Sequence, residues 1–140
     1  MIYFRAHEFV KLGRQVTNLP LTVDVCDKIK DIIFELNPVR ERYGKAIIVT
    51  SAYRPVWWEK TKGRSGESEH TFKGKGAVDL TCSDLIKLLD ELQHTKFTRI
   101  AVYPGQNFVH CDYKFPERGQ RFFVGQNWDE FSFETIKNML

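Results

Sequence analysis

The sequence has few cysteines, no cysteine pair at metal-binding spacing and no long hydrophobic run. Its three cysteines, Cys26, Cys82 and Cys111, form an odd set without a CxxC motif, which argues against a disulfide framework and favours a reducing compartment. No stretch approaches the roughly 20 apolar residues of a membrane span, and the chain does not begin with the basic-then-apolar order of a secretory signal. We therefore expect cytoplasmic synthesis without a signal peptide and no membrane partner.

Neither positive nor negative charge dominates the sequence. The net charge is only +3, which is too balanced to predict nucleic-acid binding. Apolar residues make up 42% of the chain and aromatic residues 14%, a composition that indicates a folded globule rather than disorder. With 140 residues, and without repeats or linker-like stretches, we expect one domain over residues 1–140, present as a monomer.

The hydrophobic patterning predicts a mixture of helices and short strands. Apolar spacing of three and four from Val23 predicts a helix that Thr22 caps, that Pro38 kinks and that Gly44 ends. Further helices are expected at 4–12, at 85–92 and from the Ser132 cap through Ile136 to Leu140. Strands are expected at 46–50, 77–80, 99–103, 108–112 and 121–124, and a long polar loop at 54–76. This mixture predicts an α+β domain with a mainly antiparallel sheet packed by helices.

Three residues that suit a metal ion stand in apolar or glycine-rich surroundings: His70, Asp79 and His110. A carboxylate in an apolar strand such as 77–80 is costly unless it is paired, hydrogen-bonded or bound to a metal. Two imidazoles and one carboxylate leave a fourth tetrahedral position open, which is the pattern of catalytic zinc. We therefore predict a Zn²⁺ site; taken singly, Asp79 could instead be a cap and His110 a core histidine.

Four motifs in order strengthen this prediction: Thr50–Pro55, Ser68-x-His70, Gly76–Asp79 and Phe108–Asp112. Together they resemble the zinc-dependent D-Ala-D-Ala carboxypeptidase and L-alanyl-D-glutamate endopeptidase family, particularly its small phage and prophage members. The resemblance runs from about Phe4 to Asp112 and implies the hedgehog/D-Ala-D-Ala peptidase fold. One departure is the spacing from His70 to Asp79, which is nine positions rather than seven; the glycines of 73–76 can absorb the difference.

The resemblance also implies roles for individual residues. The two histidines and Asp79 would hold the zinc, and Arg54 would orient a substrate carbonyl or carboxylate and stabilise the oxyanion. Ser68 would bind substrate or support a ligand. Tyr53 and Trp57 are further substrate-binding candidates beside Arg54, although Trp57 and Trp58 equally suit a cover for the loop.

The position of the general base departs from the family pattern. Many members carry a catalytic Glu or Asp three residues before the last histidine, where this chain has Asn107. Strand alternation places Asp112 on the same face as His110, so we expect Asp112 to act as the base or as the partner of a ligand. Glu67 and Glu69 are the alternative bases.

The expected function is therefore a zinc metallopeptidase that cleaves a peptide bond of the peptidoglycan stem peptide, next to a D-amino acid. It would resemble a phage endolysin and act on the cell wall after release. The first alternative is a non-catalytic zinc-containing cell-wall or protein binding module, as in hedgehog-type domains of similar fold, which Asn107 would suit. The second is an anionic-polymer binding domain that uses the basic residues of 54–76.

Overall fold

The computed structural model describes residues 2–13, 15–16 and 19–140. Its helical elements are the 3-10 helices η1 (Ala6–Phe9), η2 (Glu69–Thr71), η3 (Pro104–Gln106) and η4 (Pro116–Arg118) and the α-helices α1 (Val23–Tyr43), α2 (Val56–Thr61), α3 (Leu85–Leu92) and α4 (Phe133–Met139). Within these described residues, none of the helices combines the length and the apolarity that crossing a bilayer requires.

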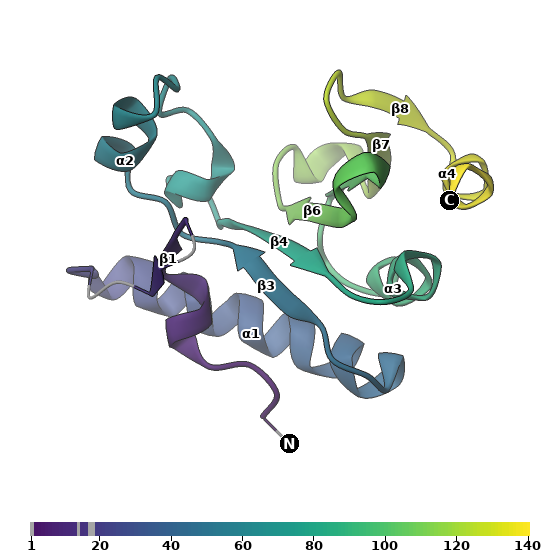
Figure 1. The fold of residues 1–140 in the computed structure, drawn as a ribbon, viewed down its shortest axis with the longest axis horizontal. Helices are drawn as coiled ribbons and strands as arrows, with labels where there is room; N and C mark the ends of the chain where they lie inside the picture. Colours follow the sequence, from purple (N-terminus) through teal and green to yellow (C-terminus); the bar gives the residue numbers. More distant parts are fainter. Residues whose placement is uncertain (1, 14, 17–18) are drawn as a thin grey trace.

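Six strands form the main sheet, and a separate hairpin lies near the N-terminus (Figure 1). The strands are β1 (Lys11–Leu12), β2 (Gln15–Val16), β3 (Ile48–Ser51), β4 (Ala77–Thr81), β5 (Arg99–Tyr103), β6 (Phe108–Asp112), β7 (Arg121–Val124) and β8 (Asp129–Phe131). The sheet order is β3-β4-β6-β5-β7-β8, and β5-β7 is its one parallel pair. The predicted α+β class with a mainly antiparallel sheet is confirmed.

The two faces of the central strands differ in chemistry. One face joins the inner sides of α1 and α3 in a buried apolar cluster, to which the strands contribute Val78, Leu80, Ile100, Val102, Val109 and Cys111. Because successive strand residues point to opposite faces, the intervening positions, including Asp79 and His110, point away from that core. The core therefore fixes which polar residues share the other face.

The long helix α1 follows its sequence signals closely. The Oγ1 atom of Thr22 accepts a hydrogen bond from the Val25 N–H at 3.1 Å, and Gly44 ends the helix with a φ of 82°. A glycine takes this left-handed conformation without steric cost. The predicted helix over 23–43 is confirmed, and it runs through Pro38.

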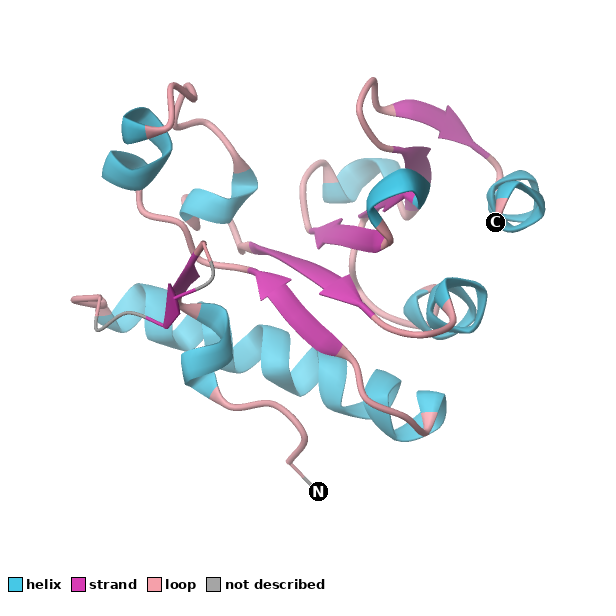
Figure 2. Cartoon of the chain, in the orientation of Figure 1, coloured by secondary structure: helices cyan, strands magenta, loops and turns pink. Residues whose placement is uncertain are grey.

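Two segments have a structure different from the one that the sequence predicts. The segment 54–76 contains α2 and η2 rather than a continuous loop (Figure 2). A buried carboxylate explains its order, because Glu59 is fully buried and pairs with both Arg54 and Arg64. The helix predicted at 4–12 is only the short η1, followed by β1.

The turn that leads into β4 requires glycine at Gly76. Its φ is +102°, and an added Cβ would lie 3.1 Å from Ile32 Cδ1 and from the Phe72 ring. We predict that Gly76→Ala lowers the free energy of unfolding, measured in urea, by about 1–3 kcal/mol. Gly105→Ala is the matched control, since no described atom lies within 4 Å of its added Cβ. Equal stability of Gly76→Ala and the wild type would contradict this account of the turn.

Candidate metal centre

The strand register brings two of the three predicted ligands together, and η2 adds the third. Asp79 of β4 lies directly opposite His110 of β6. The His110 Nδ1 atom lies 2.9 Å from Asp79 Oδ1, and His70 Nε2 lies 3.1 Å from the same oxygen and 3.2 Å from His110 Nδ1. All three side chains are buried. We call His70, Asp79 and His110 the metal trio.

His70 is oriented by the backbone at the end of β3. Its Nδ1–H donates to the carbonyl oxygen of Ala52 at 2.6 Å, which leaves the lone pair of Nε2 free to face the rest of the trio. The Ser68 Oγ accepts a hydrogen bond from the His70 N–H at 3.2 Å, and the Arg54 N–H donates to the His70 carbonyl at 2.7 Å. Ser68 thus caps the short helix that carries the ligand.

His110 is oriented by a carboxylate on its own strand. The ring Nε2–H donates to Asp112 Oδ2 at 2.7 Å, so Nδ1 is the ring nitrogen that faces Asp79 and that would bind a metal ion after losing its proton. Asp112 also accepts hydrogen bonds from Arg99 Nε at 2.9 Å and Nη2 at 2.6 Å, and from the Lys114 N–H at 3.0 Å. Arg99 lies directly opposite Asp112 in the register of β5 and β6.

The surroundings of Asp112 suit a positioning role. The side chain is fully buried, accepts hydrogen bonds from three residues and contacts the ring nitrogen of His110 that points away from Asp79. A carboxylate in that place orients the imidazole. Of the two roles expected for Asp112, general base and partner of a ligand, these contacts fit the second, and both roles stay predictions.

The electrostatics of the trio favour a positive charge. Burial alone would raise the pKa of Asp79, but His70 and His110 outweigh it and hold that pKa below its ordinary value. Burial lowers the pKa of His110, yet the hydrogen bonds to Asp112 and Asp79 raise it to about 9. For Asp112, burial is outweighed by His110 and Arg99, and the pKa falls to about 2. A site that stabilises a proton this strongly also suits a metal cation.

The geometry of the trio fits a four-coordinate metal ion such as zinc. Its three facing atoms are 2.9–3.2 Å apart, close to the about 3.3 Å that bonds of about 2.0 Å at tetrahedral angles would give. Among the described residues, no other set of three His, Cys, Asp or Glu side chains converges in this way. Two neutral imidazoles and one carboxylate leave a fourth position open, as in catalytic rather than structural zinc sites.

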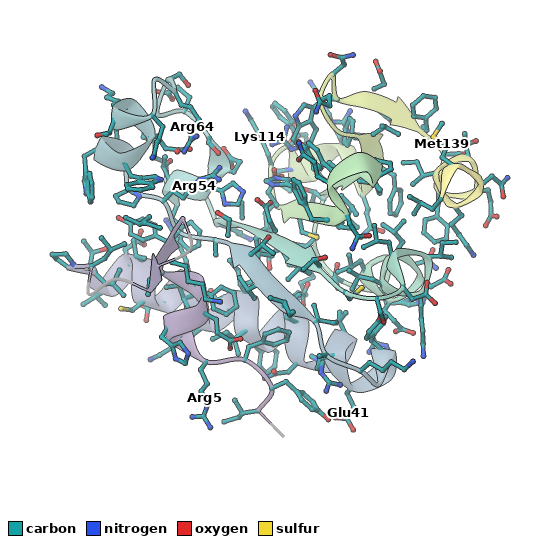
Figure 3. The ribbon with its side chains drawn as sticks, viewed as in Figure 1. Arg5, Glu41, Arg54, Arg64, Lys114 and Met139 are labelled. Carbon is teal, nitrogen blue, oxygen red and sulfur yellow. The ribbon has the colours of Figure 1, made fainter. Side chains whose placement is uncertain are left out.

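His110 is the member of the trio that lines a cleft of about 270 Å³. Its lining consists of Glu67, Ser68, Glu69, Arg99, His110, Lys114 and Trp128. In Figure 3, Lys114 lies to the right of Arg54 and Arg64, and Arg64 lies beside α2. The Trp128 ring packs edge-on against the His110 ring with centroids 5.4 Å apart. Sequence reasoning missed Trp128, because a single aromatic in a turn carries no periodic signal.

Arg54 is held beside the trio by a second buried acid. Its Nη1 donates to Ser51 Oγ at 3.3 Å, and its Nε lies 3.3 Å from Glu59 Oε1 without the alignment of a hydrogen bond. The other Glu59 oxygen accepts a hydrogen bond from Arg64 Nε at 2.7 Å. The sequence analysis did not identify Glu59. The only feature in the sequence that marks it is its position as one acid among basic and aromatic neighbours.

Tyr53 and Trp57 lie apart from the cleft. The Tyr53 ring packs edge-on against Phe72 at 5.4 Å between centroids, and burial raises the pKa of its hydroxyl. Trp57 is 57% exposed on α2 and packs against Trp58. Neither Tyr53 nor Trp57 is among the described residues that line the cleft. The structure therefore gives no contact for their predicted role in substrate binding.

Comparison with known families decides what kind of protein this is. The sequence model of the peptidase M15 family matches residues 3–112. The chain belongs to the peptidase M15 family. This confirms the resemblance inferred from the motifs, and together with the buried trio it supports a metal-dependent peptide hydrolase. The M15 match includes the trio and Asp112 and ends before Lys114 and Trp128. Among curated proteins, none matches the sequence.

The positioning role of Asp112 predicts a loss of metal affinity in Asp112→Asn. The amide cannot accept hydrogen bonds from both Arg99 and His110 as the carboxylate does, so the ring loses its fixed tautomer. We expect zinc affinity, measured by competition with a chromophoric chelator, to fall about 10- to 100-fold. Asp84→Asn is the control, because this exposed α3 cap keeps an acceptor for the Lys87 N–H. Unchanged affinity in Asp112→Asn would rule out the role.

Proposed function

We propose that this protein is a zinc metallopeptidase that hydrolyses a peptide bond of the peptidoglycan stem peptide, next to a D-amino acid. The observation that carries the proposal is the metal trio. Ala52 and Asp112 set which ring nitrogen of each histidine faces the trio, and His110 lines a polar cleft. A zinc ion held there would supply Lewis acidity that polarises a carbonyl and makes water a stronger nucleophile near pH 7.

Arg54 is the proposed donor to the substrate carbonyl. Its backbone is hydrogen-bonded to His70, which places the residue next to the trio. Ser51 contacts its Nη1 atom and Glu59 lies beside its Nε atom. Among the described residues, none forms a hydrogen bond with Nη2. A guanidinium fixed in this way can stabilise negative charge that develops on a carbonyl oxygen.

We assign the proton acceptor to Glu69. The Asn107 amide is neutral and donates to Thr81 Oγ1 at 3.3 Å, and Asp112 is buried behind His110. Glu67 lines the cleft but pairs with Lys73 at 3.3 Å in solvent. Glu69 also lines the cleft, is half-buried and has no ion-pair partner among the described residues.

The substrate class rests on the family resemblance and on surface charge. Five basic residues of the segment between β3 and β4 are exposed: Lys60, Lys62, Arg64, Lys73 and Lys75. They would attract an anionic cell-wall polymer, and added salt would weaken that attraction. Action on the cell wall after release, as part of phage or prophage lysis, belongs to the same proposal.

One observation favours a second candidate function. Asn107 stands where many relatives carry an acid, and its side chain is turned toward Thr81 and Cys82. A domain that kept the metal but lost the base would bind cell-wall or protein ligands without cleaving them. This non-catalytic module is the alternative to the peptidase.

Digestion of purified peptidoglycan separates the two functions. We expect the wild type to contain one zinc per chain by elemental mass spectrometry and to create new amino termini that mass spectrometry identifies. His110→Ala should lose both, and His94→Ala, a change at an exposed histidine, should keep both. Zinc without new termini would favour the binding module, and a protein without zinc would contradict both functions.

The assignment of Glu69 has its own matched pair of variants. Loss of a general base typically costs about 10²–10⁴ in rate, so Glu69→Gln should lower kcat by such a factor while zinc content stays at the wild-type level. Glu67→Gln, at the neighbouring acid of the same cleft, should change kcat by no more than about threefold. Full kcat in Glu69→Gln would show that another group takes the proton.

A further inference from the structure

One wall of the cleft comes mainly from residues outside the family match. Arg99, Lys114 and Trp128 line the cleft together with Glu67, Ser68 and Glu69, and we call the first three this wall. Lys114 and Trp128 both follow residue 112, where the M15 match ends. The family match therefore assigns no role to either residue, and their function has to be inferred from their contacts.

Trp128 is fixed in a strained backbone conformation. Its φ is 56°, and Gln126 in the same turn has a φ of 69°; such values are uncommon for bulky residues and cost free energy. The ring is held by Phe123 with centroids 5.3 Å apart, by the Arg99 guanidinium at 4.4 Å and by His110. The turn thus presents a rigid, half-buried indole beside a metal ligand.

Lys114 supplies the uncompensated positive charge of this wall. The positive charge of Arg99 is balanced by the carboxylate of Asp112, which it contacts in a bidentate ion pair. Lys114 has no ion-pair partner among the described residues; its Nζ lies 5.1 Å from the Phe115 ring centroid. Its side chain is half-buried and lines the cleft. The wall therefore combines one free cation with one aromatic surface.

We propose that Lys114 and Trp128 form a subsite that binds a carboxylate of the substrate and packs against the apolar group next to it. This inference rests on the proposed function, because it adds a charged group to the substrate of the same cleft. A cleft of about 270 Å³ is smaller than the roughly 300–1,000 Å³ pockets of drug-sized ligands, so it suits a short segment. The carboxylate can end the peptide or belong to a side chain, since both present the same two oxygens to Lys114.

Binding measured by isothermal titration calorimetry on the full chain tests the subsite without hydrolysis. Three probes differ in charge: N-acetyl-D-alanine has a terminal carboxylate, N-acetyl-D-isoglutamine has a side-chain carboxylate, and N-acetyl-D-alaninamide is neutral. At least one carboxylate probe should bind about tenfold more tightly than the neutral probe, the effect of one charge-assisted hydrogen bond. The preferred carboxylate probe identifies the source of the group.

Variants separate this subsite from binding to the metal or to Arg54. Lys114→Met should reduce the carboxylate preference to within about threefold, and Lys114→Arg should restore it. Trp128→Ala should weaken all three probes alike, by about three- to tenfold. Lys45→Met, which removes an exposed cation that does not line the cleft, is the control and should keep the full preference.

The result that overturns the subsite is a full carboxylate preference in Lys114→Met, or no preference in the wild type. Unchanged affinities in Trp128→Ala would overturn the role of the indole. Neither outcome depends on peptide hydrolysis. A chain that never cleaves peptidoglycan can still show the preference, and an active peptidase can lack it, so the two proposals fail separately.

Discussion

The hydrogen bond from His110 Nε2–H to Asp112 is the interaction on which the metal centre depends. It fixes the tautomer of a buried imidazole and so decides which nitrogen faces Asp79. Asp112 can remain ionised in the interior only because Arg99 and the Lys114 N–H complete its hydrogen bonds. A buried carboxylate without these donors would be costly, and the ring would lose its orientation with it.

The fold supplies these contacts through strand register. The pairing of β4, β6 and β5 sets Asp79 opposite His110 and Arg99 opposite Asp112, while the residues between them fill the core under α1 and α3. A slip of one residue would exchange the two faces of a strand and turn Asp79 or His110 toward the apolar core. The apolar core therefore holds the geometry of the polar site, although it makes no contact with a substrate.

The sequence predicted the metal trio because Asp79 and His110 interrupt apolar strands and His70 belongs to a motif that resembles the family. The shared face of His110 and Asp112 was also predictable, since it depends only on alternation. The burial of Asp112 and its pairing with Arg99, which favour the positioning role, were not predictable, because they depend on which strands are neighbours. Trp128 and Glu59 escaped for a related reason: each acts through residues that only the tertiary fold brings near.

The most direct test of this account is a crystal structure of the zinc-loaded protein. The hydrogen bonds of the trio predict that zinc is bound by His70 through Nε2, by His110 through Nδ1 and by an oxygen of Asp79, with Asp112 still bonded to His110 Nε2. Coordination through His110 Nε2, through Asp112 or through a cysteine sulfur would contradict the account.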